Sequence, residues 1–110
     1  MGTRKETVDY LLEQMSGAGM LTARKMFGEY AIYCEGKIVA LVCDDQLFIK
    51  PTAAARAFLG ADVEEAPPYP GAKLYLLISG EKWDNSEWLS ELIRVSMPEL
   101  PEPKPKKKKT

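Results

Sequence analysis

The stretch KMFGEYAIYCEGKIVALVCDDQLFIKPT, which runs from Lys25 to Thr52, decides the fold of this 110-residue chain. The polar pairs Glu35-Gly36 and Asp44-Asp45 divide it into apolar runs that are rich in strand-forming residues. Short polar turns of this kind join neighbouring antiparallel strands. The stretch therefore predicts a meander with strands over 30–34, 37–43 and 46–50, preceded by an earlier strand near 22–26.

The middle strand of this meander carries apolar side chains on both faces. Strict alternation gives one set of Ile38, Ala40 and Val42 and a second set of Val39, Leu41 and Cys43. A strand that is exposed on one face would alternate with polar residues instead. We expect a helix to cover one face, and loops or a second copy of the chain to cover the other.

Helical patterns lie on both sides of the meander. Near the N-terminus Thr3 and Glu6 fit a capping box, and apolar residues then recur at helical spacing until the SGAG turn at 16–19; these residues are Val8, Leu11, Leu12 and Met15. A short helix is predicted over 51–60, with Thr52 as its N-cap. A final helix is predicted over 85–97, with Asn85 or Ser86 as its N-cap.

The segment between the last two helices is predicted to contain a loop and one more strand. Three prolines and a glycine within 67–71 exclude a helix or a central strand, so residues 61–72 are predicted to form a loop. Residues 73–80 are predicted to form a buried strand. Strands grouped before helices indicate an α+β fold, in which N-terminal, middle and C-terminal helices pack on an antiparallel meander sheet in two layers. This domain is predicted to span residues 1–97.

Charge is distributed unevenly along the chain. Residues 98–110 contain five Lys and two Glu, whereas the preceding 97 residues contain ten Lys or Arg and fourteen Asp or Glu. This tail has almost nothing apolar to bury, so we expect it to be disordered. Lysine clusters bind the phosphates of nucleic acid, and the lysines concerned are Lys104, Lys106, Lys107, Lys108 and Lys109. The alternative is a tail that only increases solubility.

The composition argues against several classes of protein. The first ten residues lack the apolar core of a secretory signal, and no apolar run approaches the roughly 20 residues that a membrane span requires. We therefore expect a cytoplasmic protein. Histidine is absent from the chain, which removes the commonest general base and the commonest zinc ligand. No catalytic residue, metal or cofactor is predicted.

The two cysteines and the paired acids are interpreted as structural. Cys34 and Cys43 fit small buried core residues, with a redox pair across the hairpin or a metal role as the alternatives. Asp44-Asp45 and Glu64-Glu65 are interpreted as solvated turn and loop acids. The aromatic residues are assigned to the core rather than to a stacking platform for single-stranded nucleic acid. Tyr69, in the proline loop, is expected to be the most exposed of them.

Three motifs resemble the N-terminal domain of the TfoX/Sxy family of bacterial competence regulators. They are RKMFGEYAIY at 24–33, GKIVALVCDDQLFIKPT at 36–52 and APPYP at 66–70, and the resemblance covers about residues 8–97. It implies a two-layer fold similar to that of type III secretion chaperones. It also implies a regulatory or adaptor role in the expression of DNA-uptake genes, exercised with a transcription factor, and no enzymatic activity. Full-length family members carry a second, C-terminal domain where this chain has its lysine tail. The residues that the resemblance marks for partner binding are Met26, Phe27, Gly28, Lys50 and Tyr69.

The leading hypothesis is therefore a small adaptor that binds a protein of the transcription machinery through its sheet or loop surface. The second hypothesis is a nucleic-acid accessory protein that uses the basic tail as a tether. The third is an enzyme or small-ligand protein with a pocket under the 61–72 loop. A homodimer stays open as well, because a second copy would cover the second face of the middle strand.

Overall fold

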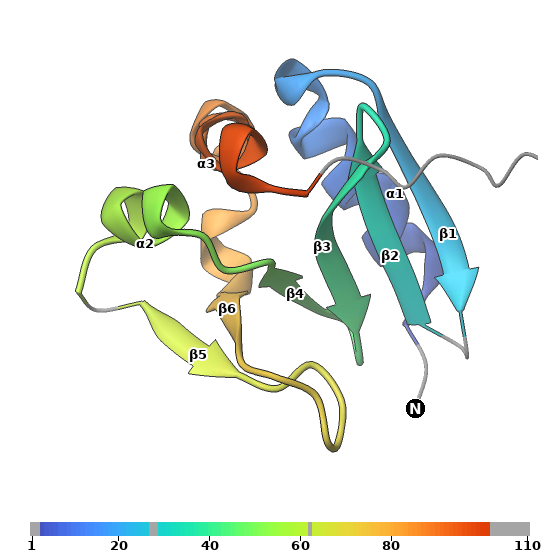
Figure 1. The fold of residues 1–110 in the computed structure, drawn as a ribbon. Coiled ribbons are helices and arrows are strands. Elements are labelled where there is room, and N and C mark those ends of the chain that lie inside the picture. The colour runs from blue at the N-terminus through green and yellow to red at the C-terminus, as the bar shows by residue number, and fades with distance from the viewer. Residues whose placement is uncertain (1–2, 27–28, 62, 102–110) are drawn as a thin grey trace, which may run out of the picture.

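The computed structural model describes residues 3–26, 29–61 and 63–101 (Figure 1). The helices and strands of these residues are α1 Lys5–Gln14, β1 Leu21–Met26, β2 Glu29–Cys34, β3 Lys37–Cys43, β4 Gln46–Ile49, α2 Ala53–Leu59, β5 Glu64–Ala66, β6 Tyr75–Ile78 and α3 Ser86–Ser96. Short 3-10 turns lie at Ser16–Ala18, Gly80–Lys82 and Met97–Glu99. The predicted meander and all three predicted helices are confirmed, with ends that differ by one or two residues.

The six strands form one antiparallel sheet in the order β1-β2-β3-β4-β6-β5. The loop predicted over 61–72 is wrong at its start, because β5 pairs there with β6. An edge strand needs hydrogen bonds on one side only, so a strand of three residues can end immediately before the prolines. Because β6 lies between β4 and β5, the chain leaves the sheet after β4 and forms the edge strand β5 first. The next strand, β6, then pairs with both β4 and β5.

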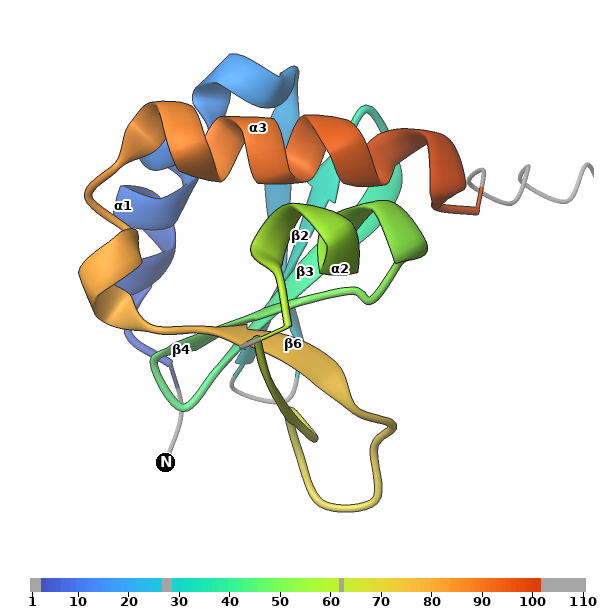
Figure 2. The same cartoon turned by 90° about the vertical axis from the view of Figure 1, so that its left-hand side faces the viewer.

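The three helices cover one face of the sheet (Figures 1 and 2). Their apolar side chains meet those of the strands in a main core. Its members from the helices include Val8, Leu11, Ala55, Leu89, Leu92 and Ile93, and those from the strands include Ile32, Val42, Leu47, Ile49, Leu76 and Ile78. The predicted two-layer α+β architecture is therefore confirmed.

An irregularity in β3 changes which of its side chains face the helices. Ile32 of β2 pairs with Ala40, but the next residue, Tyr33, pairs with Ile38, so that Val39 is an extra residue in β3. A bulge of this kind sets two residues of one strand against one residue of its neighbour and interrupts the alternation of faces. The strict alternation predicted for β3 is therefore wrong. The side chains in the main core are Val39, Ala40 and Val42, whereas Ile38, Leu41 and Cys43 lie on the opposite face.

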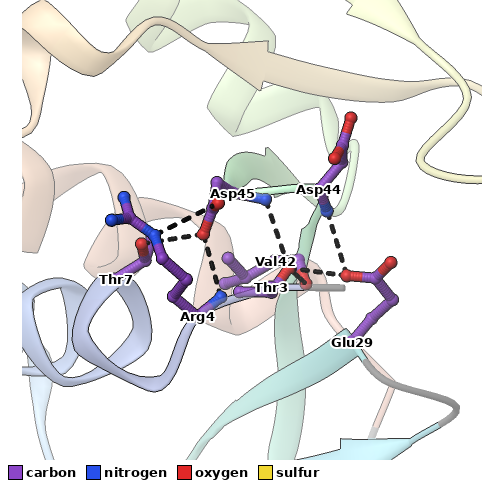
Figure 3. Close-up of polar contacts among 7 residues, drawn as sticks. All are labelled: Thr3, Arg4, Thr7, Glu29, Val42, Asp44 and Asp45. Carbon is purple, nitrogen blue, oxygen red and sulfur yellow. Dashed lines mark hydrogen bonds and ion pairs between the residues drawn. The ribbon is translucent and has the colours of Figure 1, made fainter. Parts of the chain in front are cut away.

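The start of α1 is fixed by the β3–β4 turn (Figure 3). The predicted capping box of Thr3 and Glu6 is wrong, because Arg4 is the N-cap residue and forms no side-chain cap bond. Instead, Asp45 Oδ1 accepts hydrogen bonds from the Arg4 backbone N–H and the Thr7 hydroxyl, both at 2.9 Å. A carboxylate at a helix N-terminus also interacts favourably with the helix dipole.

Thr3 ties the N-terminal segment to the sheet beside the same turn (Figure 3). Its hydroxyl lies 2.6 Å from Glu29 Oε1 and 3.0 Å from the Val42 carbonyl oxygen, and it accepts a hydrogen bond from the Asp45 N–H at 3.2 Å. Glu29 Oε1 also accepts from the Asp44 N–H at 2.9 Å. The N-terminal segment, the start of β2, the end of β3 and the β3–β4 turn are thereby joined by polar contacts.

The remaining helix caps agree with the sequence. Thr52 Oγ1 accepts a hydrogen bond from the Ala55 N–H at 3.0 Å, and Asn85 Oδ1 accepts one from the Trp88 N–H at 3.1 Å. These bonds satisfy backbone donors that a helix leaves unpaired in its first turn.

The folded part of the chain continues beyond residue 97. Met97–Glu99 form a 3-10 turn, and Leu100 is 4% exposed in the main core. Leu100, which lies in the segment predicted as tail, therefore contributes a buried side chain to the core of the domain. Residues 102–110, with the five tail lysines, lie outside the described residues.

Candidate interaction face of the sheet

The face of the sheet that points away from the helices, which we call the outer face, carries a second apolar cluster. Its described members all come from strands; the buried ones are Ala31, Leu41, Cys43 and Phe48, and the half-buried ones are Tyr33, Ile38, Ala66, Tyr75 and Leu77. The buried members are at most 4% exposed. Both faces of β3 are thus covered within one chain, so the pattern that suggested a homodimer does not require a second copy.

The loop between β5 and β6 extends away from the helices (Figure 2). Tyr69 and Leu74 in this loop are 52% and 51% exposed, whereas Pro68 beside them is buried. The predicted exposure of Tyr69 is confirmed. Large apolar side chains held in solvent by an anchored loop are the groups that protein interfaces most often bury.

Lys50 and Tyr75 connect the outer face to this loop. The Lys50 Nζ atom lies 5.8 Å from the centroid of the Tyr75 ring, which is a cation–π contact across the β4–β6 pair. Burial, and then the nearby Tyr69 and Cys43 groups, raise the pKa of the Tyr75 hydroxyl. Near neutral pH the Tyr75 hydroxyl therefore stays protonated, and the Lys50 ammonium group contacts the ring of an uncharged tyrosine.

The structure brings together two of the residues predicted for partner binding and separates a third. Lys50 stacks on the Tyr75 ring, and Tyr69 is near enough to influence the pKa of the same tyrosine. Met26, however, ends β1, which two other strands separate from β4. The remaining two, Phe27 and Gly28, lie outside the described residues.

Leu74 and Tyr75 belong to this surface although the sequence did not mark them as site residues. Tyr75 was assigned to the core on its apolar surroundings, and its contact with Lys50 follows only from the pairing of Ile49 with Leu76 across β4 and β6. The KLYLLI alternation around it was the available signal, since it places Tyr75 and Leu77 on one face.

The cysteines cannot pair, because they lie on opposite faces of the sheet, with Cys34 in β2 beside the start of β3 and Cys43 at the end of β3. Cys34 belongs to the main core and pairs with Lys37, the first residue of β3, whereas Cys43 is its last residue and belongs to the outer face. Six residues of strand span roughly 20 Å, and the Cα atoms of a disulfide are at most about 7 Å apart. Burial raises the pKa of the Cys43 thiol to about 11 and also raises that of Cys34. The redox-pair alternative is therefore wrong, and the interpretation as core residues is confirmed.

One acid of each pair is held by structural contacts. The bonds from the Arg4 N–H and the Thr7 hydroxyl lower the pKa of Asp45, which is opposite to the change that a general acid at neutral pH requires. Glu65 forms an ion pair with Arg56 of α2. Across residues 3–26, 29–61 and 63–101, no three His, Cys, Asp or Glu side chains gather as metal ligands would.

A small hollow lies under the start of the 61–72 segment. It has a volume of about 150 Å³ and is lined by Leu59, Val63, Glu64, Leu77, Ile78, Ser79 and Lys82. Wider hollows of about 470 Å³ and 370 Å³ adjoin it, and pockets that enclose metabolites or drugs usually measure roughly 300–1,000 Å³. The hypothesis of a small-ligand pocket under this segment therefore stays a prediction. In the part of the chain that the structure describes, no helix is both long and apolar enough to cross a membrane.

Comparison with known proteins relates this geometry to a family. The family described as the TfoX N-terminal domain matches the chain over residues 13–100. The chain belongs to the TfoX N-terminal domain family. It is also 36% identical over 110 residues to a Spirochaeta aurantia protein described as an uncharacterized 12.7 kDa protein in the trpE 5' region, and this alignment covers 100% of the chain and 94% of that protein.

The match to the TfoX N-terminal domain includes every strand of the sheet, and with it the outer face and the β5–β6 loop. It ends at residue 100, which is also the last residue of the main core. The resemblance seen in the three sequence motifs is thus confirmed. This family is not a known enzyme family.

Proposed function

We propose that the chain is a non-enzymatic regulatory adaptor that binds a protein of the transcription machinery and acts on the expression of DNA-uptake genes. The binding surface is the outer face together with the β5–β6 loop. The observation that carries the proposal is the pair of exposed side chains, Tyr69 and Leu74, beside a half-buried apolar face that no described helix covers.

The chemistry of this surface favours a protein partner. Aromatic side chains are enriched in protein interfaces, charged residues are depleted at the centre of an interface, and its rim is polar. Tyr69, Leu74 and Tyr75 supply the apolar area, and Lys50 supplies a charge whose partner is an aromatic ring. A lysine held in this way can donate a hydrogen bond to a carboxylate of the partner without losing its ring contact.

The reactive groups of the chain support a role without catalysis. The thiols are buried and their pKa values are raised, and the Asp45 carboxylate is engaged at the start of α1. Histidine is absent from the sequence. Binding is therefore the function that the described side chains serve best.

The proposal is tested by site-specific photo-crosslinking in the cells that make this protein. Benzoylphenylalanine in place of Tyr69 should cross-link to an identified transcription factor or RNA polymerase subunit. Met20, which is 70% exposed and precedes β1 at the other edge of the sheet, is the matched control position and should not give this product.

The Y69A/L74A variant should change the transcript levels of DNA-uptake genes to the same extent as deletion of the whole gene. M20A should leave these transcripts unchanged. Equal cross-linking from both positions, or transcripts that respond to neither deletion nor Y69A/L74A, would contradict the proposal.

A second candidate function is nucleic-acid binding through the tail lysines. The observation that favours it is the contrast between a tail with five Lys and two Glu and a preceding part with an excess of acids. Such binding depends on phosphate neutralisation and weakens steeply with salt.

A further inference from the structure

Among the described residues, nothing pairs with the outer edge of the β1 strand. It is the first strand of the sheet order and pairs with β2 on its inner side (Figure 1). The Glu35 N–H donates to the Met20 carbonyl oxygen at 2.9 Å. This bond shows which residues of β1 direct their backbone N–H and C=O groups toward β2. Because antiparallel pairs alternate, the backbone groups of Thr22 and Arg24 point toward β2. Those of Leu21, Ala23 and Lys25 point outward, as a row of donors and acceptors that could pair with another strand.

This edge is marked by two adjacent exposed cations, Arg24 and Lys25. Neither forms an ion pair with a described residue. Other cations of the domain are engaged, such as Arg4 with Asp45, Arg56 with Glu65 and Lys50 with the Tyr75 ring. Successive residues of a strand project to opposite faces. The two charges therefore flank the free backbone edge, Arg24 on the outer face and Lys25 on the face of α1.

Charges on an edge strand normally prevent sheets from joining. Antiparallel pairing of β1 with β1 of a second copy would bring four cations together, and like charges across a strand pair are destabilising. The same charges favour a strand of the opposite sign. Two successive acidic residues would project to opposite faces and lie beside Arg24 and Lys25.

We propose that β1 binds an extended acidic segment of a partner protein, which adds to the sheet as a seventh strand. The backbone of Leu21, Ala23 and Lys25 supplies the hydrogen bonds, and Arg24 and Lys25 select the charge. This surface lies at the opposite edge of the sheet from the β5–β6 loop, so the inference is independent of the function proposed for the outer face.

The inference is tested by nuclear magnetic resonance with ¹⁵N-labelled full-length protein. The probe is the blocked peptide TVEEVT, and its matched control is TVKKVT. With TVEEVT the amides of Leu21, Ala23 and Lys25 should shift and exchange with solvent several-fold more slowly. The amides of Thr22 and Arg24 are already bonded to β2, and their exchange should change little. The Y69A/L74A variant should bind TVEEVT as the natural chain does.

Two variants separate the charge from the backbone contribution. R24E/K25E should weaken TVEEVT binding by at least about tenfold and bind TVKKVT instead, since exposed charge pairs each contribute modestly and both pairs change from attraction to repulsion. A23P removes one outward N–H and leaves the bonds to β2 in place, so it should abolish peptide protection while the remaining spectrum persists.

Three results would overturn the inference. The first is a natural chain that does not bind TVEEVT, or binds TVEEVT and TVKKVT equally. The second is R24E/K25E with an unchanged charge preference. The third is slow exchange of the Leu21, Ala23 and Lys25 amides without peptide, together with a dimeric mass, which would assign the edge to a second copy.

Discussion

Replacing Asp45 with alanine should destabilise the domain clearly more than the same change at its neighbour Asp44. Asp44 and Asp45 form the β3–β4 turn, with φ angles of +55° and +58°, respectively. Holding an alanine in this left-handed conformation costs about 1 kcal/mol at either position. The side chains differ in their contacts. The Asp44 carboxylate forms no hydrogen bond with a described residue, whereas Asp45 holds the start of α1.

The additional loss at Asp45 follows from its contacts. Its carboxylate accepts from the Arg4 N–H and the Thr7 hydroxyl, and helix caps of this kind contribute about 1–2 kcal/mol. The Arg4–Asp45 ion pair adds little, because the two side chains are 71% and 35% exposed. The expected losses are therefore about 1 kcal/mol for D44A and about 2–3 kcal/mol for D45A.

Urea denaturation followed by tryptophan fluorescence measures both losses, since Trp83 and Trp88 are half-buried. For a domain of this size the urea dependence is about 1–2 kcal/mol per M. The midpoint of D45A should therefore lie about 1 M below that of D44A. Equal midpoints for the two variants would refute the reasoning, because they would show that the Asp45 carboxylate does not stabilise α1.

The pH dependence gives an independent check with D45N, which keeps one side-chain oxygen as an acceptor in the turn and removes the charge. Because the bonds from Arg4 and Thr7 lower the folded pKa of Asp45 from its ordinary value of 3.8, the ionised group stabilises the folded state above that value. This stabilisation is lost as the pH falls through the lower, folded pKa. The difference in unfolding free energy between the natural chain and D45N should accordingly be full near pH 6 and shrink below pH 4.

Three further outcomes are expected. Both cysteines, Cys34 and Cys43, should react slowly with thiol reagents in the folded state because burial raises their pKa values. Mass spectrometry after mild oxidation should find no disulfide between them, and an intramolecular disulfide would contradict their placement on opposite faces. L100A should lower the unfolding free energy by about 2–4 kcal/mol because it leaves a cavity in the core, whereas P101A, at an exposed position, should change it little in the same urea experiment. Deleting residues 102–110 should abolish salt-sensitive binding of a fluorescent single-stranded oligonucleotide; binding that survives the deletion would exclude the tail as a tether.

The meander could be predicted from the sequence because its signals are local. Asp44 and Asp45 tolerate a positive φ, and Glu35-Gly36 does the same between β2 and β3. Because each short turn brings the apolar runs on its two sides together, these runs pair as neighbouring antiparallel strands. The cap at Thr52 was equally visible, since its partner Ala55 lies within the same helical turn.

The candidate site was predicted only in part. Tyr69 was expected to be exposed because prolines surround it, and that depends on its neighbours in sequence. The contact of Lys50 with Tyr75 joins positions 25 residues apart, and the insertion of β6 between β4 and β5 decides it. The sequence resemblance also marked Met26 for partner binding, but Met26 ends β1, which lies at the opposite edge of the sheet from β5.

By itself, the sequence determined which segments become helix and strand, with the exception of β5, since backbone preference, side-chain alternation and turn chemistry act within a few residues. Tertiary structure alone decided that Asp45 caps α1, that a bulge at Val39 exchanges the faces of Ile38 and Val39, and that Leu100 lies in the core. The physical reason is that these contacts join positions that are distant along the chain, or depend on how two strands match in register. Their free energy is gained only when the whole sheet and its helices have closed around one another.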